Sequence, residues 1–247
     1  MTTLRPVRDR VLDLLPRDVD RTRYQILIST LSDWKELFLG KRVLDFGASY
    51  GTSLVALINL GASEVVGVEP DLSRVTLGRE LIPKAVPGAR ASLEHIPDTA
   101  ALPFADGSFG FILANAVLEH IPQPRDAYIL ELWRLLSEGG HLMINETPNK
   151  YFPKELHTTH LWGNHWLPRS LAHWRAIRRK RFDAGRTDWD SSGWRGLGYF
   201  ELVRSLRHYQ VVPERTRLRH WLLAKLGVPP SVLDPYPCWV FKKLAPT

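Results

Sequence analysis

Residues 43–53, Val-Leu-Asp-Phe-Gly-Ala-Ser-Tyr-Gly-Thr-Ser, constrain the fold more than any other part of this chain. An apolar run that passes an acid and small residues before a helical pattern is typical of a buried parallel strand turning tightly into a helix. A second apolar run, residues 65–69, follows at the distance of one strand–helix–strand unit and ends in Glu69. Because parallel strands end at the same edge of a sheet, Glu69 should lie beside the first turn and accept hydrogen bonds from both hydroxyls of a ribose. The sequence therefore predicts a doubly wound α/β fold that binds a nucleoside-containing cofactor.

The loop itself indicates which kind of nucleoside it binds. It holds two glycines, Gly47 and Gly51, whereas the dinucleotide-binding fingerprint needs three. It resembles instead the first motif of class I S-adenosylmethionine-dependent methyltransferases, in which an acid precedes a Gly-x-Gly-x-Gly loop. Asp45, Gly47 and Gly51 match this motif, and Ser49 replaces its central glycine. Serine is small enough to keep the loop close to a ligand.

The resemblance continues through residues 97–109, 111–121 and 135–144. These segments are similar to the Asp-Ala-Glu-x-Leu-Pro-Phe, Ser-Phe-Asp and Leu-Glu-His segments that small-molecule methyltransferases of the type 11-like branch carry in the same order. The resemblance implies that Asp98 meets the adenine amino group, with Thr99 alongside. It departs from the family pattern at Ala100, where an acid is frequent, and at Gly110, where aspartate is usual.

Membership of this branch implies a mostly parallel, seven-stranded, Rossmann-like sheet with an antiparallel last strand and, in this chain, a basic, Trp-rich insertion. It implies S-adenosylmethionine as the cofactor. The residues that the resemblance nominates for cofactor binding are Asp45, Gly47, Ser49, Gly51, Glu69, Pro70, Asp98, Thr99 and Asn115.

Composition is typical of a cytoplasmic enzyme. The chain has 247 residues, enough for one large domain or a domain with an added lobe, and a single cysteine, Cys238, so no internal disulfide can form. We expect Cys238 to be a buried residue of the last strand. The first residues lack an apolar signal region, and no apolar run approaches the length of a membrane span.

Charge divides the chain unevenly. Residues 1–149 hold 15 Lys+Arg and 19 Asp+Glu, net −4, whereas residues 150–247 hold 18 and 7, net +11. Seven of the nine tryptophans lie in the second, basic part. Such a lobe suits an anionic partner, and its tryptophans either stack on sugars or bases or form its core.

The pattern of apolar residues predicts the organisation of the chain. We expect helices at 20–39, 71–81, 124–136 and 196–208, and later strands at 141–146, 209–212 and 237–243. Pro124 is expected in the first turn of its helix, and Gly139-Gly140 is expected to stop that helix. The expected domains are a helical N-terminal lid at 1–39, a cofactor-binding core at 40–149, a substrate-facing insertion at 150–198 and the completion of the sheet at 199–247.

The start of the insertion carries a second resemblance. Its Thr-Pro-Asn-x-x-Phe-Pro, His-Thr and His-Trp-Leu-Pro segments, within residues 147–168, are similar to those of methyltransferases associated with bacterial cell-surface glycan and glycolipid clusters. This resemblance favours a sugar, a glycolipid or a similar small hydroxyl compound as the methyl acceptor.

A sugar hydroxyl needs a base, and histidine is the natural one near neutral pH. We expect His157 to be that base, with His120 and His165 as the next candidates. His157, His160 and His165 with Glu155 could also suggest a metal site, but their spacing of three and five in an irregular segment is not that of ligands on a helix, so no metal is expected.

Residues 169–182 are predicted to form a basic helix with Leu171, Trp174 and Phe182 along one side. Such a helix either lies on an anionic membrane surface or packs on the lobe as an ordinary solvated helix. The leading function is O-methylation of a glycan, a glycolipid or a related compound. The alternatives are a quinone or phenol methyltransferase, an RNA methyltransferase and a non-enzymatic cofactor-binding protein. Nucleic acid is disfavoured because residues 115–118, Asn-Ala-Val-Leu, lack the Asn/Asp-Pro-Pro-aromatic group.

Overall fold

The structure is a computed structural model that describes residues 21–186, 188–212 and 234–246. The chain divides into two compact units. The first unit holds the residues up to Leu113 together with Glu131–Leu142, and the second holds Ala114–Leu130 and the residues from Met143 onward. Each unit is described by itself.

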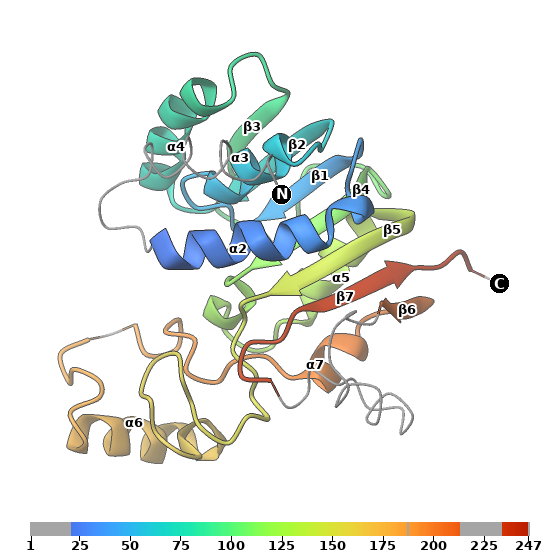
Figure 1. Cartoon of the computed structure of the whole chain (residues 1–247). Coiled ribbons are helices and arrows are strands. Elements are labelled where there is room, and N and C mark those ends of the chain that lie inside the picture. The colour runs from blue at the N-terminus through green and yellow to red at the C-terminus, as the bar shows by residue number, and fades with distance from the viewer. Residues whose placement is uncertain (1–20, 187, 213–233, 247) are drawn as a thin grey trace. The chain divides into compact units, whose positions relative to one another are not determined.

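A seven-stranded sheet with the order β3-β2-β1-β4-β5-β7-β6 forms the centre of the fold (Figure 1). Strands β1 and β2 are parallel, as are β2 and β3, whereas β6 and β7 are antiparallel. The expected seven-stranded, mostly parallel Rossmann-like sheet is therefore confirmed. The strands are β1 (Arg42–Phe46), β2 (Glu64–Glu69), β3 (Ala91–His95), β4 (Phe109–Asn115), β5 (Leu136–Asn145), β6 (Tyr209–Val212) and β7 (Trp239–Lys243).

Six α-helices and three short 3-10 helices lie in the described part of the chain. The helices are α2 (Arg21–Asp33), α3 (Thr52–Asn59), α4 (Leu72–Ala85), α5 (Asp126–Leu135), α6 (Arg169–Arg178), α7 (Tyr199–Val203), η1 (Lys35–Leu37), η2 (Leu118–His120) and η3 (Asn164–Trp166). None of these helices combines the length and the apolar character that a membrane span requires.

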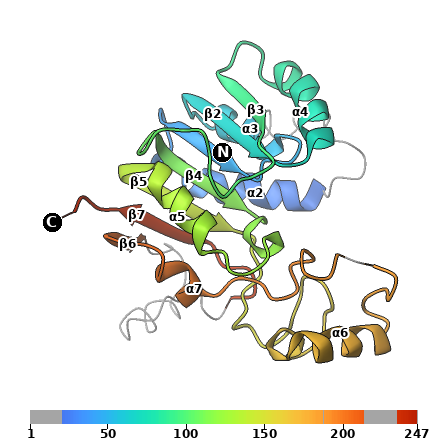
Figure 2. The same ribbon diagram turned by 180° about the vertical axis from the view of Figure 1, so that it is seen from behind.

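Helices α2 and α4 in the first unit follow from local sequence signals. Tyr24, Leu27, Ile28 and Leu31 recur at helical spacing and are buried, which fixes one face of α2. The helix expected over 20–39 ends at Asp33 and continues as η1, while Asp20 lies outside the described residues. Asp71 caps α4, because its side chain accepts hydrogen bonds from the amides of the first turn. Figures 1 and 2 show α4 beside β3.

The boundary between α5 and β5 differs from the one expected, a helix stopped by Gly139-Gly140 and a strand that begins at 141. Pro124 precedes α5 rather than opening it, and β5 begins at Leu136, directly after the helix. The glycine pair therefore lies inside the strand. Gly139 has a φ of 73°, and a Cβ on Gly140 would lie 3.1 Å from the carbonyl oxygen of Gly110 in β4. Glycine is required here by the backbone turn and by the close approach of two strands, not by the end of a helix.

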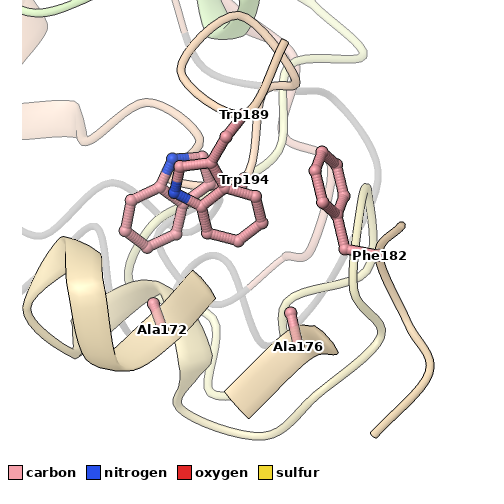
Figure 3. Close-up of a cluster of buried hydrophobic side chains, with 5 residues drawn as sticks. All are labelled: Ala172, Ala176, Phe182, Trp189 and Trp194. Carbon is pink, nitrogen blue, oxygen red and sulfur yellow. The ribbon is translucent and has the colours of Figure 1, made fainter. Parts of the chain in front are cut away.

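A separate apolar cluster supports the insertion in the second unit (Figure 3). The cluster consists of Ala172, Ala176, Phe182, Trp189 and Trp194. The rings of Trp189 and Trp194 stack with their centroids 4.6 Å apart, and the edge of the Phe182 ring meets Trp189. These two tryptophans are therefore core residues of the basic part and do not serve to stack on sugars or bases.

The basic helix differs from expectation in length and in the face it buries. Helix α6 ends at Arg178, before the left-handed Lys180, and its buried face is formed by Ala172 and Ala176. Leu171 and Trp174, expected along one side of this helix, are 44% and 54% exposed. Small residues allow α6 to approach the tryptophan pair closely, so the large apolar side chains lie on the outer face.

Two further expectations change near the end of the chain. The helix expected over 196–208 is shorter, because α7 covers only Tyr199–Val203. Cys238 is half-buried and directly precedes β7, which begins at Trp239, so it is not a buried strand residue. Strand β6 occupies 209–212 as expected and pairs with β7.

Candidate functional site

The loop between β1 and α3 has the backbone of a glycine-rich loop. Gly47, Ser49 and Gly51 have φ values of 75°, 50° and 81°, and all three therefore lie in the left-handed region. Ser49, which replaces the central glycine of the family motif, keeps the conformation that a glycine would favour. The amides of Gly47 and Ala48 both donate 3.0 Å hydrogen bonds to the carbonyl oxygen of Val68. These bonds attach the loop to the carboxyl end of β2.

Glu69 ends β2 and joins the same loop from the other side. Its side chain is 5% exposed; Oε2 accepts a 2.9 Å hydrogen bond from the amide of Ser49, and Oε1 accepts one of 3.2 Å from the amide of Asp71. A carboxylate has about four acceptor positions, so two remain for a ligand. The acid is thus held in a fixed orientation before any ligand binds.

Asp45 lies inside β1 and is almost completely buried. Its Oδ2 accepts a 2.5 Å hydrogen bond from Oγ of Ser53, in the first turn of α3. Burial raises the pKa of Asp45 to about 7; the Ser53 hydrogen bond lowers this pKa and the charge of Glu69 raises it further. Asp45 therefore connects β1 to α3.

The remaining nominated residues occupy three places. The carbonyl oxygen of Pro70 lies 3.1 Å from Nε2 of His95, and Asp98 is exposed, with Oδ1 accepting a 3.0 Å hydrogen bond from the amide of Ala100. Thr99 is half-buried beside Asp98. Asn115 is the last residue of β4 and belongs to the second unit, where its Oδ1 accepts a 2.7 Å hydrogen bond from Nδ2 of Asn145.

Two of the three nominated histidines come together in the second unit. The rings of His120 and His157 meet edge to face, with their centroids 5.2 Å apart. Nδ1 of His120 lies 2.8 Å from the carbonyl oxygen of Ser191, so this nitrogen carries the proton and donates it. The carboxylate of Glu155 accepts hydrogen bonds from the amides of His157 and Thr158, at 2.5 and 2.7 Å, which fixes the turn that presents His157.

Glu119 is the third member of this group, and the sequence analysis did not nominate it. It is 1% exposed; Oε2 accepts a 3.0 Å hydrogen bond from Oγ1 of Thr147, and Oε1 lies 3.8 Å from Nε2 of His120. Burial raises the pKa of Glu119, and the neighbouring His120 counteracts that shift. An acid directly before a nominated histidine in the Leu-Glu-His segment was the available sequence signal.

An open pocket of about 770 Å³ lies in front of the two histidines, within the second unit. Ten of its thirteen lining residues are polar or charged, and they include three cationic side chains, Lys180, Arg181 and Arg186. His165 is not among the lining residues; it is buried beside Trp166, and burial lowers its pKa. The structure thus separates His165 from the pocket that His120 and His157 share.

Comparison with known proteins identifies the domain. A family model described as "Methyltransferase domain" matches residues 44–144. An uncharacterized methyltransferase from Mycobacterium leprae is 34% identical over 110 residues, which are 44% of this chain and 38% of the relative. A demethylmenaquinone methyltransferase from Renibacterium salmoninarum is 31% identical over 114 residues, which are 46% of this chain and 44% of the relative. The chain therefore spans about two fifths of the length of these curated relatives.

A solved structure extends the likeness of fold beyond the matched segment. Magnesium protoporphyrin IX methyltransferase from Synechocystis PCC 6803, solved with bound SAH, has a TM-score of 0.58 at 15% identity, and the likeness covers 95% of this chain and 93% of that chain. With a matching family model over the glycine loop, β2, β4 and most of β5, residues 44–144 are a class I S-adenosylmethionine-dependent methyltransferase domain of the type 11 branch.

Proposed function

We propose that this protein is an enzyme that transfers the methyl group of S-adenosylmethionine to a hydroxyl of a sugar, a glycolipid or a similar small compound. The observation that carries the acceptor half of this proposal is the open pocket lined by His120, His157 and three cationic side chains. The assignment of S-adenosylmethionine as the cofactor rests on the loop between β1 and α3 in the first unit and on the acids around that loop.

The loop residues fit the cofactor. Gly47, Ser49 and Gly51 all adopt left-handed backbone conformations that keep the loop compact, and the amide of Ser49 donates to Glu69. We assign the ribose hydroxyls to Glu69 and the adenine amino group to Asp98. When bound, the cofactor supplies a methyl group already activated as a sulfonium. The protein must then position the acceptor, exclude water and remove a proton.

The pocket suits a polar acceptor that carries an anionic group. Lys180 and Arg181 can pair with phosphate or carboxylate, whereas Arg186 already donates to both carboxylate oxygens of Asp188. The lining also contains the acid Asp183. The Thr158, Ser191 and Ser192 side chains can hydrogen-bond to sugar hydroxyls. A phosphorylated or nucleotide-activated sugar has both kinds of group. The proton of its reacting hydroxyl leaves at the histidine pair, with His157 as the first candidate and His120 as the second.

A quinone or phenol acceptor is the second candidate, because a demethylmenaquinone methyltransferase is among the relatives. That match covers 46% of this chain. The three apolar residues of the pocket, Ile177, Phe182 and Ala184, offer an isoprenoid tail little contact. The RNA methyltransferase and the non-enzymatic cofactor-binding protein have no further observation in their favour.

Helix α6 supports a peripheral attachment to anionic membranes, which would bring a lipid-linked acceptor to the enzyme. Its outer face exposes Leu171, Trp174 and Arg178, and the Arg178 guanidinium lies 5.4 Å from the centroid of the Trp174 ring. Tryptophan and arginine together suit the headgroup region of a bilayer. Co-sedimentation with phosphatidylglycerol vesicles should be strong at low salt and should weaken in Trp174→Ala; failure of the wild type to bind would remove the membrane attachment.

Turnover of S-adenosylmethionine to S-adenosylhomocysteine, measured against a panel of acceptors, tests the enzymatic proposal. The panel should contain sugar phosphates, nucleotide sugars, glycolipids, neutral sugars, quinones and RNA. We expect turnover with the anionic sugar compounds. Product formed only with quinones would transfer the proposal to the second candidate, and product formed only with RNA would refute the glycan assignment. Cofactor binding without turnover on any acceptor would favour the non-enzymatic alternative.

A further inference from the structure

We propose that Glu119, His120 and His157 form a binding site for a divalent transition-metal cation, in the class of Zn²⁺, Co²⁺, Mn²⁺ and Fe²⁺. Each residue offers one ligand atom, and the three atoms lie within 4.8 Å of one another. Glu119 and His120 belong to η2, and His157 comes from the insertion of the same unit. Two imidazoles and one carboxylate are a ligand set that transition metals favour and that leaves coordination positions open.

The arrangement of acceptor atoms in the cluster favours a bound cation. Nδ1 of His120 donates to the carbonyl oxygen of Ser191, so in the neutral imidazole Nε2 carries the lone pair. This lone pair faces Oε1 of Glu119 at 3.8 Å, and Oε1 is buried and accepts no hydrogen bond from the described residues. Glu119 is fully buried, whereas the His120 side chain is 46% exposed, so the pair opens toward solvent on one side. A buried carboxylate oxygen with no donor favours a positive charge beside it. A proton on Nε2 supplies that charge in the metal-free protein, and a divalent cation that binds both atoms can replace the proton.

The groups around the cluster hold the ligands as a metal site requires. Metal-binding histidines commonly donate their second nitrogen to a carbonyl oxygen, as His120 does to Ser191. The second oxygen of Glu119 is held by the hydroxyl of Thr147. Gly193 closes the site from behind, because a Cβ there would lie 2.7 Å from Cδ2 of His157 and 3.0 Å from Cγ of Glu119.

The proposed site differs from the set of His157, His160, His165 and Glu155, whose spacing in the sequence did not favour a metal site. His160 is exposed, and neither His160 nor His165 belongs to the cluster, which shares only His157 with the earlier set. His120 and Glu119 lie 37 and 38 positions before His157 in the chain. Spacing along the sequence could not reveal a ligand set that tertiary folding assembles.

The cation also gives the histidine pair a specific part in methyl transfer, and this step rests on the proposed function. His120 and His157 line the pocket, so an open coordination position can take an oxygen of the acceptor. A bound divalent cation lowers the pKa of a coordinated hydroxyl, as it does for water. With the cation bound, the imidazoles would hold the metal and the coordinated hydroxyl would lose its proton to solvent. Without the cation, the histidine pair is the base, as in the proposed function.

Direct metal binding tests the site independently of catalysis. Tag-free protein, freed of metal by chelation and dialysis, is titrated calorimetrically with Zn²⁺ in the absence of cofactor and acceptor, and Co²⁺ is followed by its visible absorption. We expect one equivalent of Zn²⁺ to bind and the Co²⁺ spectrum to indicate nitrogen and oxygen ligands. Glu119→Gln, His120→Asn and His157→Asn should each weaken binding about 10–100-fold or more. His160→Asn is the matched control, because it removes an exposed histidine of the same insertion at a left-handed position that asparagine tolerates.

The result that overturns the site is wild-type protein that binds no stoichiometric Zn²⁺ or Co²⁺, or binding that all three ligand variants retain. Circular dichroism of each metal-free variant separates a lost ligand from a misfolded chain, and three independent variants guard against one that fails to fold. Metal binding without turnover on any acceptor would retain the site while refuting the proposed function. Turnover that is unaffected by chelation, in protein that binds no metal, would retain the proposed function while refuting the metal site.

Discussion

The backbone amide of Ser49 donates a 2.9 Å hydrogen bond to Oε2 of Glu69. This bond joins the two sequence features that first indicated a cofactor, the small-residue loop after β1 and the acid at the end of β2. The same carboxylate also accepts a hydrogen bond from the amide of Asp71, directly before α4. Glu69 therefore has a structural role in the loop as well as its proposed role toward the ribose.

Replacement of Glu69 by alanine should weaken binding of S-adenosylmethionine by about 1.5–3 kcal/mol, the range for hydrogen bonds to a charged group. The loss combines the ribose contacts with the orientation of the Ser49 amide. Calorimetric titration measures it. Glu94→Ala, in the neighbouring strand β3, is the control, because Glu94 is exposed and pairs with Arg79. Equal affinity of wild type and Glu69→Ala, with the variant folded, would refute the ribose role.

Gly51→Ala should destabilise the first unit more than Gly88→Ala does. Both glycines have positive φ, 81° and 73°, so an added methyl group strains the backbone similarly, by about 1–2 kcal/mol. Only at Gly51 would the new Cβ also meet Ile82, whereas at Gly88 nothing lies within 4 Å. Urea unfolding of both variants gives the difference, which isolates the contact with Ile82. Similar losses in the two variants would show that Ile82 relaxes without cost.

The buried carboxyl of Asp45 should make stability depend on pH in a specific direction. Its folded-state pKa, about 7, is raised above the ordinary value of 3.8, so the folded protein binds this proton more tightly than the unfolded chain. The resulting contribution to the free energy of unfolding is complete below about pH 3.8 and is lost as the pH rises through about 7. We therefore expect the stability of wild type relative to Asp45→Asn to fall over that interval by a few kcal/mol, on the order of 1.4 per pKa unit.

Urea unfolding of both proteins at several pH values measures this difference and cancels the titration of other groups. A constant difference between wild type and Asp45→Asn across the interval would show that Asp45 titrates alike in the folded and unfolded states.

Arg125 should be the most sensitive charged residue of the second unit. It pairs with Glu201 at 3.2 Å, both side chains are buried, and its guanidinium also donates to the carbonyl oxygens of Ile121, Gly196 and Glu119. Arg125→Ala leaves these carbonyl oxygens without this donor and leaves the buried Glu201 carboxylate, among the described residues, with only Lys150, whose Nζ donates to it at 3.2 Å. The variant should lower the free energy of unfolding by about 3 kcal/mol, the lower end of the range for breaking a buried pair.

The neighbouring pair of Arg204 and Asp126 is a matched control for that measurement. It links the start of α5 to the residue after α7, yet the Arg204 side chain is 59% exposed. Arg204→Ala should therefore leave the free energy of unfolding almost unchanged. Equal losses for the two variants would show that burial does not set the strength of these pairs.

His157→Ala should lower turnover by roughly 10²–10⁴-fold and leave the affinity for S-adenosylmethionine unchanged. The reason is that His157 meets the acceptor side of the reaction, whether its ring takes the proton or holds a cation. Steady-state kinetics and calorimetry measure the two quantities, with His160→Asn as the control. Unchanged turnover in His157→Ala and in His120→Ala would leave positioning alone as the source of catalysis and would favour an acceptor with an acidic hydroxyl, such as a phenol.

Local sequence determined the first unit well, because its signals act between near neighbours. The apolar run into Asp45, the small residues at 47–51 and the apolar run ending in Glu69 predicted β1, the loop and β2 at their observed positions. The sequence interpretation did not locate β3, and it misplaced the start of β5. A glycine pair can end a helix or allow two strands to approach closely. The approach of Gly140 to Gly110 shows that here the pair serves the second purpose.

The sequence by itself determined the class of fold and the cofactor, and it nominated His120 and His157, because each of those inferences depends on a motif within a short stretch of the chain. Tertiary structure decided the rest. It buried Trp189 and Trp194 against the small residues of α6, placed Leu171 and Trp174 on the outer face, and separated His165 from the pocket. It also brought Glu119 and His120 to His157. These outcomes depend on side chains distant in sequence competing for the same buried volume, and no local pattern records the result of that competition.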